Sequence, residues 1–203
     1  MISLRLATIG DLPGTYRVCL LTGDESCDAT AIYRNPDLLG HVFVGPYVVG
    51  EPDLAFVIAD DDGVAGYALA TADTRGFEAW AAAHWWPSLR EQYPPRDDGS
   101  PDAELIALIH APSPASESLV RDFPAHLHID LLERVRGRGF GRLMIERLLS
   151  ELRERASPGV HLDVAIGNAR AIAFYHHLGF HEVERGEASI QLGMRLTSSM
   201  KVC

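Results

Sequence analysis

Two histidines and one aspartate, His126, His128 and Asp130, alternate with apolar residues in a short stretch of the chain. Catalytic zinc sites commonly use three protein ligands and one water, so these side chains form a candidate metal site of a hydrolase. However, known sites of this spacing place their ligands on loops at strand ends. Here the apolar residues at positions 125, 127, 129 and 131 continue the alternation of a sheet strand. We therefore interpret residues 125–132 as a strand with one polar face and expect no metal.

A second stretch, residues 136–142, combines three glycines with three arginines directly after this strand. Glycines allow backbone N–H groups to approach an anion, and the positive end of the following helix lies at the same place. Arginine side chains add charge-assisted contacts to phosphate. The pattern indicates a phosphate-binding turn, although a strand–helix turn with solvated arginines has the same composition. A Walker loop would need Gly-Lys-Ser/Thr, and a dinucleotide fingerprint would follow an early strand.

The turn resembles a motif of the GNAT-fold N-acetyltransferases, Gln/Arg-x-x-Gly-x-Gly/Ala, through Arg136, Gly139 and Gly141. A second part of that family's signature follows at residues 168–180, "NARAIAFYHHLGF", and residues 5–19 are similar to the family's opening strand and helix. The resemblance implies an α/β fold whose mixed, mostly antiparallel central sheet is flanked by helices on both faces. It also implies that acetyl-coenzyme A (acetyl-CoA) binds with its pyrophosphate at the turn.

Residues 35–67 and 123–132 are similar to the acetyltransferase-like C-terminal domain of O-GlcNAcases, and this similarity extends over most of the chain. In animal members that domain is regarded as a pseudoenzyme with a degraded cofactor site. This sequence differs because its glycine-arginine turn is whole. The resemblance leaves two functions open. One is an acetyl-CoA-dependent N-acetyltransferase, in which a primary amine attacks the thioester directly; the other is an acetyl-CoA-binding module without turnover.

The resemblance also implies roles for individual residues. By position, the backbone of Ile129, Leu131 and Leu132 would hold the pantetheine arm and the thioester. Tyr175 matches the tyrosine that faces the coenzyme sulfur, which makes it the candidate general acid, and a tyrosine packed between helix and sheet is the alternative. The other cofactor contacts implied by the motifs are Arg136, Gly137, Arg138, Gly139, Phe140, Gly141, Arg142, Asn168, Ala171 and Phe174. Asn168 is also a candidate helix cap.

The general base is less clear than the general acid. The glutamate that some family members carry falls on or near Ala125, which cannot accept a proton. Asp130 is the nearest carboxylate, and His126 and His128 are the alternatives. A carboxylate is a weak base at neutral pH unless burial raises its pKa. We therefore expect Asp130 to act as the base only if it is buried.

Contacts with the acceptor amine are expected from two segments, residues 24–53 and the helix of residues 77–93. Acidic side chains in the first segment would attract a cationic amine, or they form a solvated loop. The residues concerned are Asp24, Glu25 and Asp28 in the first segment and Trp80, Trp85 and Trp86 in the second. A small molecule, a peptide and a protein lysine all remain possible acceptors, and dimers are frequent in the family.

Composition excludes some classes of function. The net charge of −10 argues against nucleic-acid binding, which normally requires a basic surface. No run approaches the roughly 20 apolar residues that cross a bilayer, so no membrane association is expected. The three cysteines, Cys19, Cys27 and Cys203, have no CxxC or zinc spacing, which favours a reducing cytoplasm. The length of 203 residues favours a single domain, 1–203.

The elements that position these residues follow from hydrophobic periodicity and turn residues. Strands are expected at residues 3–8, 125–132, 160–166, 180–185 and 188–196, with a hairpin at 54–72 around an Asp-Gly turn. Helices are expected at 9–23, 77–93, 139–156 and 168–179, with Asp11 and Asn168 as caps and Gly23 and Gly179 as stops. Residues 94–104 and 111–118 are expected to be loops, and residues 24–53 are expected to be rich in loops, with apolar islands around residues 37–49.

Overall fold

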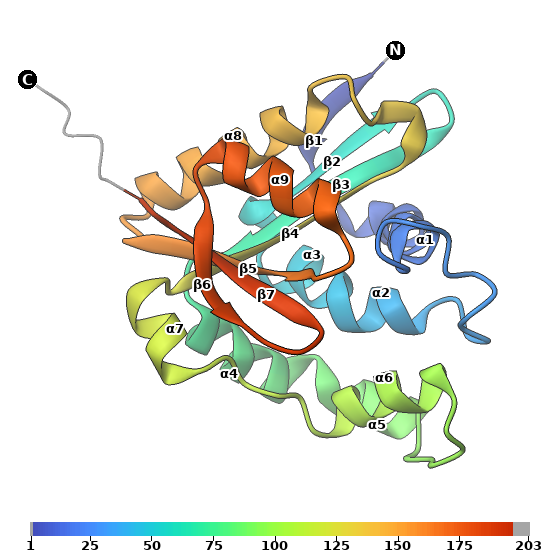
Figure 1. The fold of residues 1–203 in the computed structure, drawn as a ribbon. Coiled ribbons are helices and arrows are strands. Elements are labelled where there is room, and N and C mark those ends of the chain that lie inside the picture. The colour runs from blue at the N-terminus through green and yellow to red at the C-terminus, as the bar shows by residue number, and fades with distance from the viewer. Residues whose placement is uncertain (1, 197–203) are drawn as a thin grey trace, which may run out of the picture.

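Seven strands form one sheet within residues 2–196, the part of the chain that this computed structural model describes. Residue 1 and residues 197–203, including Cys203, lie outside the described residues. The strand order is β1-β2-β3-β4-β5-β7-β6. Their bounds are β1 Ser3–Leu6, β2 Ala55–Asp60, β3 Gly63–Thr71, β4 Ala125–Leu131, β5 Gly159–Ala165, β6 His181–Arg185 and β7 Ser189–Arg195. Only β4 and β5 pair in parallel, so the sheet is mixed and mostly antiparallel, as expected (Figure 1).

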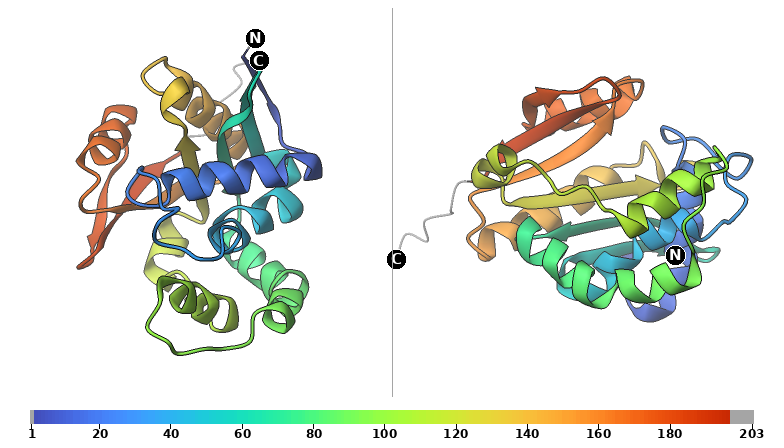
Figure 2. Two further views of the ribbon diagram at one scale, coloured as in Figure 1. Left: turned by 90° about the vertical axis from the view of Figure 1, so that its right-hand side faces the viewer. Right: turned by 90° about the horizontal axis from the view of Figure 1, so that it is seen from below.

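Helices cover both faces of this sheet (Figure 2). Helices α8 (Phe140–Glu154) and α9 (Ala169–Leu178) bury Met144, Leu148 and Tyr175 against one face in a core with Phe56 and Leu127. The opposite face carries a second core around Val57, Tyr67 and Leu69. The helices that contribute to this second core are α1 (Leu12–Thr22), α2 (Leu38–Phe43), α3 (Gly45–Gly50), α4 (Thr74–His84), α5 (Trp86–Gln92) and α6 (Pro101–His110). Alternate residues of β2 and β3 therefore enter different cores, as strand geometry requires.

Residues 24–53 are less rich in loops than expected, because the apolar islands of the second half form the helices α2 and α3. Gly40 and Gly45 lower helix propensity, which is why the stretch looks irregular in sequence. In the structure these glycines leave room for aromatic rings, because a Cβ on Gly40 would meet the Tyr16 ring and one on Gly45 would meet Trp85. Tertiary packing therefore overrides local propensity here.

Two other expectations about helices need correction. The single helix at 77–93 is two helices, α4 and α5, because the chain turns at Trp85 and restarts with Pro87 in the first turn of α5. The loops at 94–104 and 111–118 are each shorter than expected. Ser100 caps α6 and Ser116 caps α7 (Glu117–Asp122), each by accepting a backbone N–H.

The caps and stops expected from sequence are partly confirmed. The Asn168 side chain accepts the N–H of Ala171 at 3.0 Å, and Gly179 ends α9 in the left-handed conformation with φ 98°. Asp11 precedes α1 but does not cap it by its side chain. Its carboxylate instead accepts hydrogen bonds from Arg5 and from Thr8. Among residues 2–196, no helix is long and apolar enough to cross a membrane.

Candidate functional site

Strand β4 leaves one edge open along half of its length. It pairs with β3 from His126 to Leu131 but with β5 only at Ala125 and His126. The N–H of Leu132 donates to the carbonyl of Ala65 at 2.8 Å. Because antiparallel pairs alternate, Ile129 and Leu131 direct their backbone groups away from β3 and into the gap toward β5. This open edge offers hydrogen-bonding groups to a bound molecule.

A cavity of about 510 Å³ lies in this gap, on the α8–α9 side of the sheet. It brings together the end of β4, the glycine-arginine turn, the start of α9 and the loop after α1. The residues lining it are Glu25, Ser26, Cys27, Ile129, Asp130, Leu131, Arg136, Gly137, Gly139, Gly141, Arg142, Asn168, Arg170, Ala171, Phe174 and Tyr175. Twelve of these were expected from sequence as catalytic or cofactor-binding residues.

The glycine-arginine turn presents open backbone to the cavity. Gly137 has φ 70° and Gly139 has φ 84°, a region that favours glycine. A Cβ at either position would meet nothing within 4 Å, so the space beside both residues is open. Gly139 is the N-cap of α8, and no side chain caps this helix. The N–H groups of its first turn therefore point at the cavity without a competing acceptor, which suits an anion.

The arginines of the site have different tasks. Arg136 holds the framework, because its Nε donates to the Leu131 carbonyl at 2.6 Å and its Nη2 to the Ser26 carbonyl at 2.9 Å. Among the residues that the structure describes, Arg142 contacts a charged partner only at Glu146, at a long distance of 3.7 Å. Arg170 at the start of α9 has no hydrogen bond or ion pair with any residue between 2 and 196. Arg142 and Arg170 therefore leave positive charge available at the cavity.

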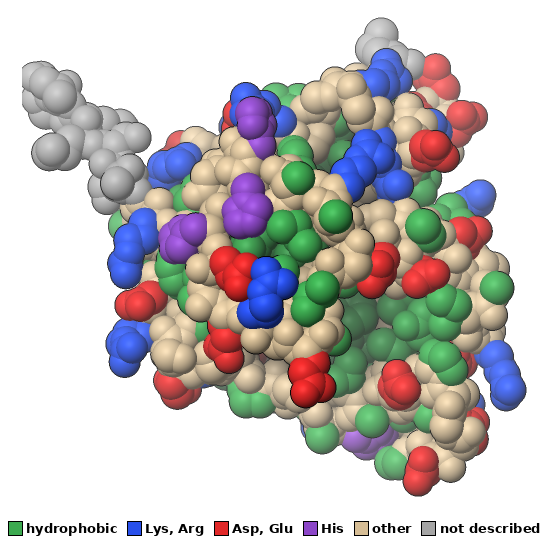
Figure 3. Space-filling view, viewed as in Figure 1, with side chains coloured by type: hydrophobic (Ala, Val, Ile, Leu, Met, Phe, Trp, Pro, Cys, Tyr) green, Lys and Arg blue, Asp and Glu red, His purple; other side chains and the backbone are tan. Residues whose placement is uncertain are grey.

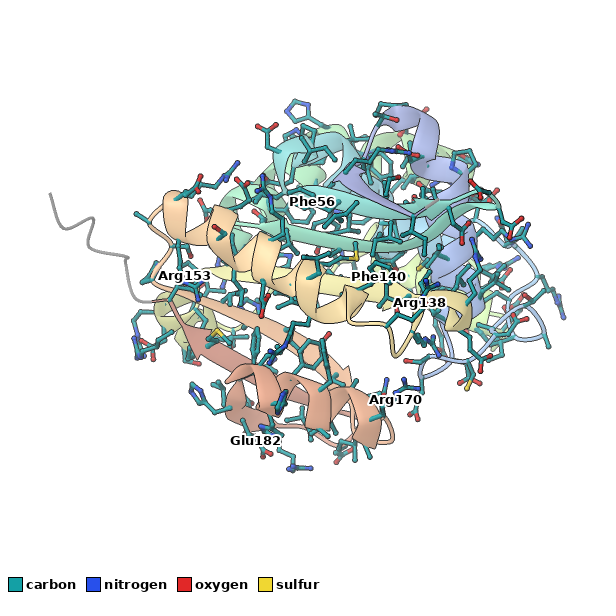
Figure 4. All side chains as sticks on the ribbon, turned by 90° about the horizontal axis from the view of Figure 1, so that it is seen from above. Phe56, Arg138, Phe140, Arg153, Arg170 and Glu182 are labelled. Carbon is teal, nitrogen blue, oxygen red and sulfur yellow. The ribbon has the colours of Figure 1, made fainter. Side chains whose placement is uncertain are left out.

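Three of the expected cofactor contacts lie outside the cavity lining. Leu132 has its N–H bound to Ala65 and its side chain packed on the second core. The Arg138 guanidinium stacks over the Phe140 ring, 5.4 Å from its centroid, and Phe140 packs against the first core. Figure 4 shows Arg138 beside the start of α8 and Arg170 at the start of α9.

The loop after α1 forms a wall of the cavity that the motifs did not reveal. Ser26 accepts a hydrogen bond from Asn168 Nδ2 at 3.1 Å through its hydroxyl, and its carbonyl accepts from Arg136. Glu25 and Ser26 have φ 48° and 77°, the left-handed region that is unusual for such residues. Of the acidic residues expected to attract an amine, Glu25 lines this cavity, whereas Asp28 accepts hydrogen bonds from Thr30. Residues 24–53 were expected to contact the acceptor, but no motif singled out Ser26, Cys27 or Arg170.

Tyr175 is buried, and its ring packs in the first core beside Phe180. The residue also lines the cavity, and its hydroxyl has no hydrogen-bond partner among residues 2–196. Burial raises the pKa of Tyr175 above its usual value, and the nearby Asp130 raises it further. The phenol is therefore protonated at neutral pH and free to donate. Tyr175 therefore combines a ring packed in the core with a hydroxyl group that is available in the cavity.

Asp130 also lines the cavity, and its carboxylate lies on the face of the sheet that carries the second core, to which Tyr67 belongs. Tyr67 donates a hydrogen bond to its Oδ2 at 2.6 Å. Burial raises the pKa of Asp130 to about 6, although the bond from Tyr67 and the charge of Arg136 both act to lower it. This pKa places the carboxylate close to the range in which it can accept a proton near neutral pH.

The histidines of β4 are held by other side chains. Tyr47 hydrogen-bonds Nε2 of His126 at 2.6 Å and Nε2 of His128 at 3.0 Å. Thr74 contacts Nδ1 of His126 at 2.7 Å. Within residues 2–196, no group of three or more His, Cys, Asp or Glu side chains is arranged to hold a metal ion. These contacts argue against the metal-site interpretation of His126, His128 and Asp130.

The three tryptophans that were expected to contact the acceptor lie in different environments. Trp85 donates its Nε1–H to the His41 carbonyl at 2.9 Å, and Trp80 packs against Gly50. Trp86 lines a second cavity, on the other face of the sheet. The helical segment expected to contact the acceptor therefore contributes Trp86 to a cavity, while Trp85 has a structural role.

Comparisons with known proteins agree with this arrangement. The sequence model of the Acetyltransferase (GNAT) family matches residues 28–180, more than half of the chain. The chain is 30% identical to Protein O-GlcNAcase of Rattus norvegicus over 181 residues, which are 87% of this chain but 20% of that protein. It therefore spans about a fifth of the length of this relative.

A shorter match is to the [Ribosomal protein bS18]-alanine N-acetyltransferase of Salmonella typhimurium, 47% identical over 45 residues, 22% of this chain and 30% of that protein. Among solved structures, SsHAT is 38% identical with a TM-score of 0.90, covering 97% of this chain and 98% of that chain. The ribosomal-protein-S18-alanine N-acetyltransferase of Escherichia coli shares the fold at 16% identity, with a TM-score of 0.53 over 100% and 99% of the two chains. Together with the architecture of the cavity, the family match identifies this chain as a member of the GNAT acetyltransferase family.

Proposed function

We propose that the chain is an acetyl-CoA-dependent N-acetyltransferase that transfers an acetyl group to a primary amine. One observation carries the proposal. A single cavity joins the open edge of β4, an uncapped helix start with two left-handed glycines, and a proton donor and a proton acceptor, Tyr175 and Asp130. A solved family neighbour, yncA of Salmonella typhimurium, carries acetyl-CoA as its cofactor.

The residues of the cavity fit this cofactor. Gly137, Gly139 and the first turn of α8 would hold the pyrophosphate, with Arg142 and Arg170 adding positive charge. The backbone of Ile129 and the N–H of Leu131 would bind the amide groups of the pantetheine arm, because the Leu131 carbonyl already accepts a hydrogen bond from Arg136. Ala171 and Phe174 offer apolar contact to the same arm. When bound, acetyl-CoA supplies the acetyl group in activated form as a thioester.

Asp130 and Tyr175 then move the protons of the reaction. A new bond forms between the amine nitrogen and the acetyl carbon, and the carbon–sulfur bond breaks. The neutral amine attacks, so an ammonium ion first releases one proton to solvent. Asp130 accepts the second proton as the nitrogen–carbon bond forms, and Tyr175 donates its hydroxyl proton to the departing sulfur. Proton exchange with solvent restores both groups, so the net products are the N-acetylated amine and free coenzyme A.

Binding without turnover is the second candidate, which the resemblance to the acetyltransferase-like C-terminal domain of O-GlcNAcases implies. Two assays separate the candidates. Heat denaturation with millimolar acetyl-CoA tests binding, because a ligand that binds only the folded state raises the melting temperature. Release of free thiol over a panel of primary amines tests turnover. Stabilisation with thiol release supports the enzyme, stabilisation alone supports the binding module, and no stabilisation refutes both.

A further inference from the structure

A second cavity of about 610 Å³ lies on the face of the sheet opposite α8 and α9. Its apolar walls include Phe43, Phe77, Trp86 and Leu108. Figure 3 shows hydrophobic side chains gathered in a hollow between the β6–β7 hairpin and the helices beyond it, with acidic side chains around the rim. The volume lies within the range of small-molecule sites, which span roughly 300–1,000 Å³ and combine apolar walls with a few polar groups.

This cavity adjoins the cofactor cavity along β4. Leu127 and His128 line the second cavity, and the next two residues, Ile129 and Asp130, line the first. β5 no longer pairs with β4 beyond His126, so the sheet is open where the two cavities approach each other. His128 and Asp130 lie on the same face of the strand, about 7 Å apart along it. A molecule bound at His128 is therefore close to the proposed base.

A directional chain of hydrogen bonds ends at His128. The Thr74 hydroxyl must donate to the Pro124 carbonyl, 2.7 Å away, because a carbonyl can only accept. Thr74 therefore accepts from Nδ1–H of His126 at 2.7 Å. Burial lowers the pKa of His126 well below its usual value, so this ring is neutral and its Nε2 accepts the Tyr47 hydroxyl proton. The Tyr47 oxygen then accepts Nε2–H of His128.

The chain leaves Nδ1 of His128 without a proton. Burial lowers the pKa of His128 to about 4, so the ring is neutral at physiological pH and does not repel a cation. Within residues 2–196, Nδ1 of His128 has no hydrogen-bond partner. The cavity thus contains a fixed acceptor nitrogen whose orientation is set by Tyr47.

The charges around the cavity suit a cation. The described residues that line it include the carboxylates of Glu78, Asp163 and Glu184 and no lysine or arginine. Glu78 is paired with Arg75 at 2.6 Å, whereas Asp163 and Glu184 have no ion-pair partner among the described residues. The Oε1 atom of Gln191 is buried in the lining and has no hydrogen-bond partner within residues 2–196. Negative charge and vacant acceptors favour a positively charged ligand over an anion.

We propose that the second cavity binds the acceptor, and that the acceptor is a small primary amine on an apolar or aromatic body. Its amine nitrogen donates to Nδ1 of His128, its body packs against Phe77, Trp86 and Leu108, and the carboxylates of Asp163 and Glu184 favour its charge. The assignment as acceptor site rests on the proposed function, whereas binding of such amines to the cavity can be measured without it.

Isothermal titration calorimetry with 2-phenylethylamine tests the site directly. Ethylamine lacks the aromatic body and 2-phenylethanol lacks the charge, so both are expected to bind at least about tenfold more weakly. Leu108→Trp fills the cavity and abolishes binding, while the control Leu6→Trp, at an exposed leucine outside both cavities, leaves it unchanged. Equal binding of the three compounds, or normal binding to Leu108→Trp, would overturn the proposal.

Two substitutions of His128 keep the test independent of Leu108. Gln at this position places a polar group near the Nε2 site and keeps the bond to Tyr47, but it removes the Nδ1 acceptor. Asn places an oxygen near the Nδ1 site. We expect His128→Gln to weaken the binding of 2-phenylethylamine about tenfold. His128→Asn should weaken this binding less, because only His128→Gln loses the hydrogen bond to the charged amine. The reverse order contradicts the role of Nδ1.

Thermal stabilisation by coenzyme A is measured on the same proteins. Amine binding without stabilisation by coenzyme A refutes the proposed function but not the amine site. A different result refutes the amine site and leaves the acetyltransferase in place. In that case coenzyme A stabilises the protein and peptides are acetylated, but 2-phenylethylamine does not bind. The two proposals therefore fail in distinguishable ways.

Discussion

Asp130→Asn is expected to stabilise the protein at neutral pH while removing its proton acceptor. Burial raises the pKa of Asp130 from an ordinary 3.8 to about 6. A carboxyl group whose pKa is higher in the folded state contributes most to stability below pH 3.8. Its contribution falls as the pH rises from 3.8 to about 6, because the unfolded chain then loses its proton first. Asparagine keeps the shape and accepts the same bond from Tyr67, and it carries no charge.

The size of this stability difference follows from the pKa shift of Asp130. Each pKa unit corresponds to about 1.4 kcal/mol, so a difference of roughly two units amounts to about 3 kcal/mol as an upper limit. The free energy of unfolding of the wild type should therefore fall by up to about 3 kcal/mol more than that of Asp130→Asn between pH 4 and pH 7. Comparing the two proteins at both pH values cancels any effect of the substitution that does not depend on charge.

Urea denaturation at pH 4 and pH 7 measures this difference, and thiol release at pH 7 measures the loss of activity. A variant that is more stable only at pH 7 and inactive agrees with a buried carboxylate kept for proton transfer. An equal stability difference at both pH values would show that the pKa of Asp130 is not raised. Full activity of the variant would show that Asp130 is not the base.

Three further predictions concern the same cavity. Tyr67→Phe removes the bond that lowers the pKa of Asp130, so the rising limb of the pH–rate profile should move up by about one unit or more, and an unchanged limb would contradict the role of that bond. Gly139→Ala should lower the free energy of unfolding by about 1 kcal/mol and abolish the thermal stabilisation by acetyl-CoA. The control Gly99→Ala, at an equally open loop position with φ 67°, should lower the free energy of unfolding in urea by as much but leave acetyl-CoA binding unchanged. Tyr175→Phe should lower kcat about 100-fold while coenzyme A binding stays within a few-fold of wild type in calorimetry, and a normal kcat would assign Tyr175 to packing alone.

Parts of the cavity built from local sequence were predictable. The spacing of Gly137, Gly139 and Gly141 after an apolar strand indicated the turn, and the structure gives positive φ values to the first two. The cap by Asn168 and the stop at Gly179 followed from residue type alone. Each of these features depends on residues a few positions apart, which is the range in which sequence patterns carry information.

Features that depend on distant contacts were not predictable. Ser26 joins the cavity through bonds to Arg136 and Asn168, which lie 110 and 142 positions away in the chain. The second cavity likewise depends on Tyr47 from α3 meeting the histidines of β4. Neither contact produces a periodic pattern in the sequence. The role of Leu132 also depends on pairing, because its N–H is taken up by Ala65 on β3.

The proposed function requires that acetyl-CoA, bound in the cavity beside α8 and α9, gives its acetyl group to an amine. The most direct test is a mass-spectrometric assay that follows free coenzyme A and N-acetylated 2-phenylethylamine together, with wild-type protein and with Asp130→Asn. The account predicts that both products appear in equal amounts with the wild type and that neither appears above background with the variant. Tight binding of acetyl-CoA to the wild type, with neither product formed from this or any other amine of the panel, would contradict it.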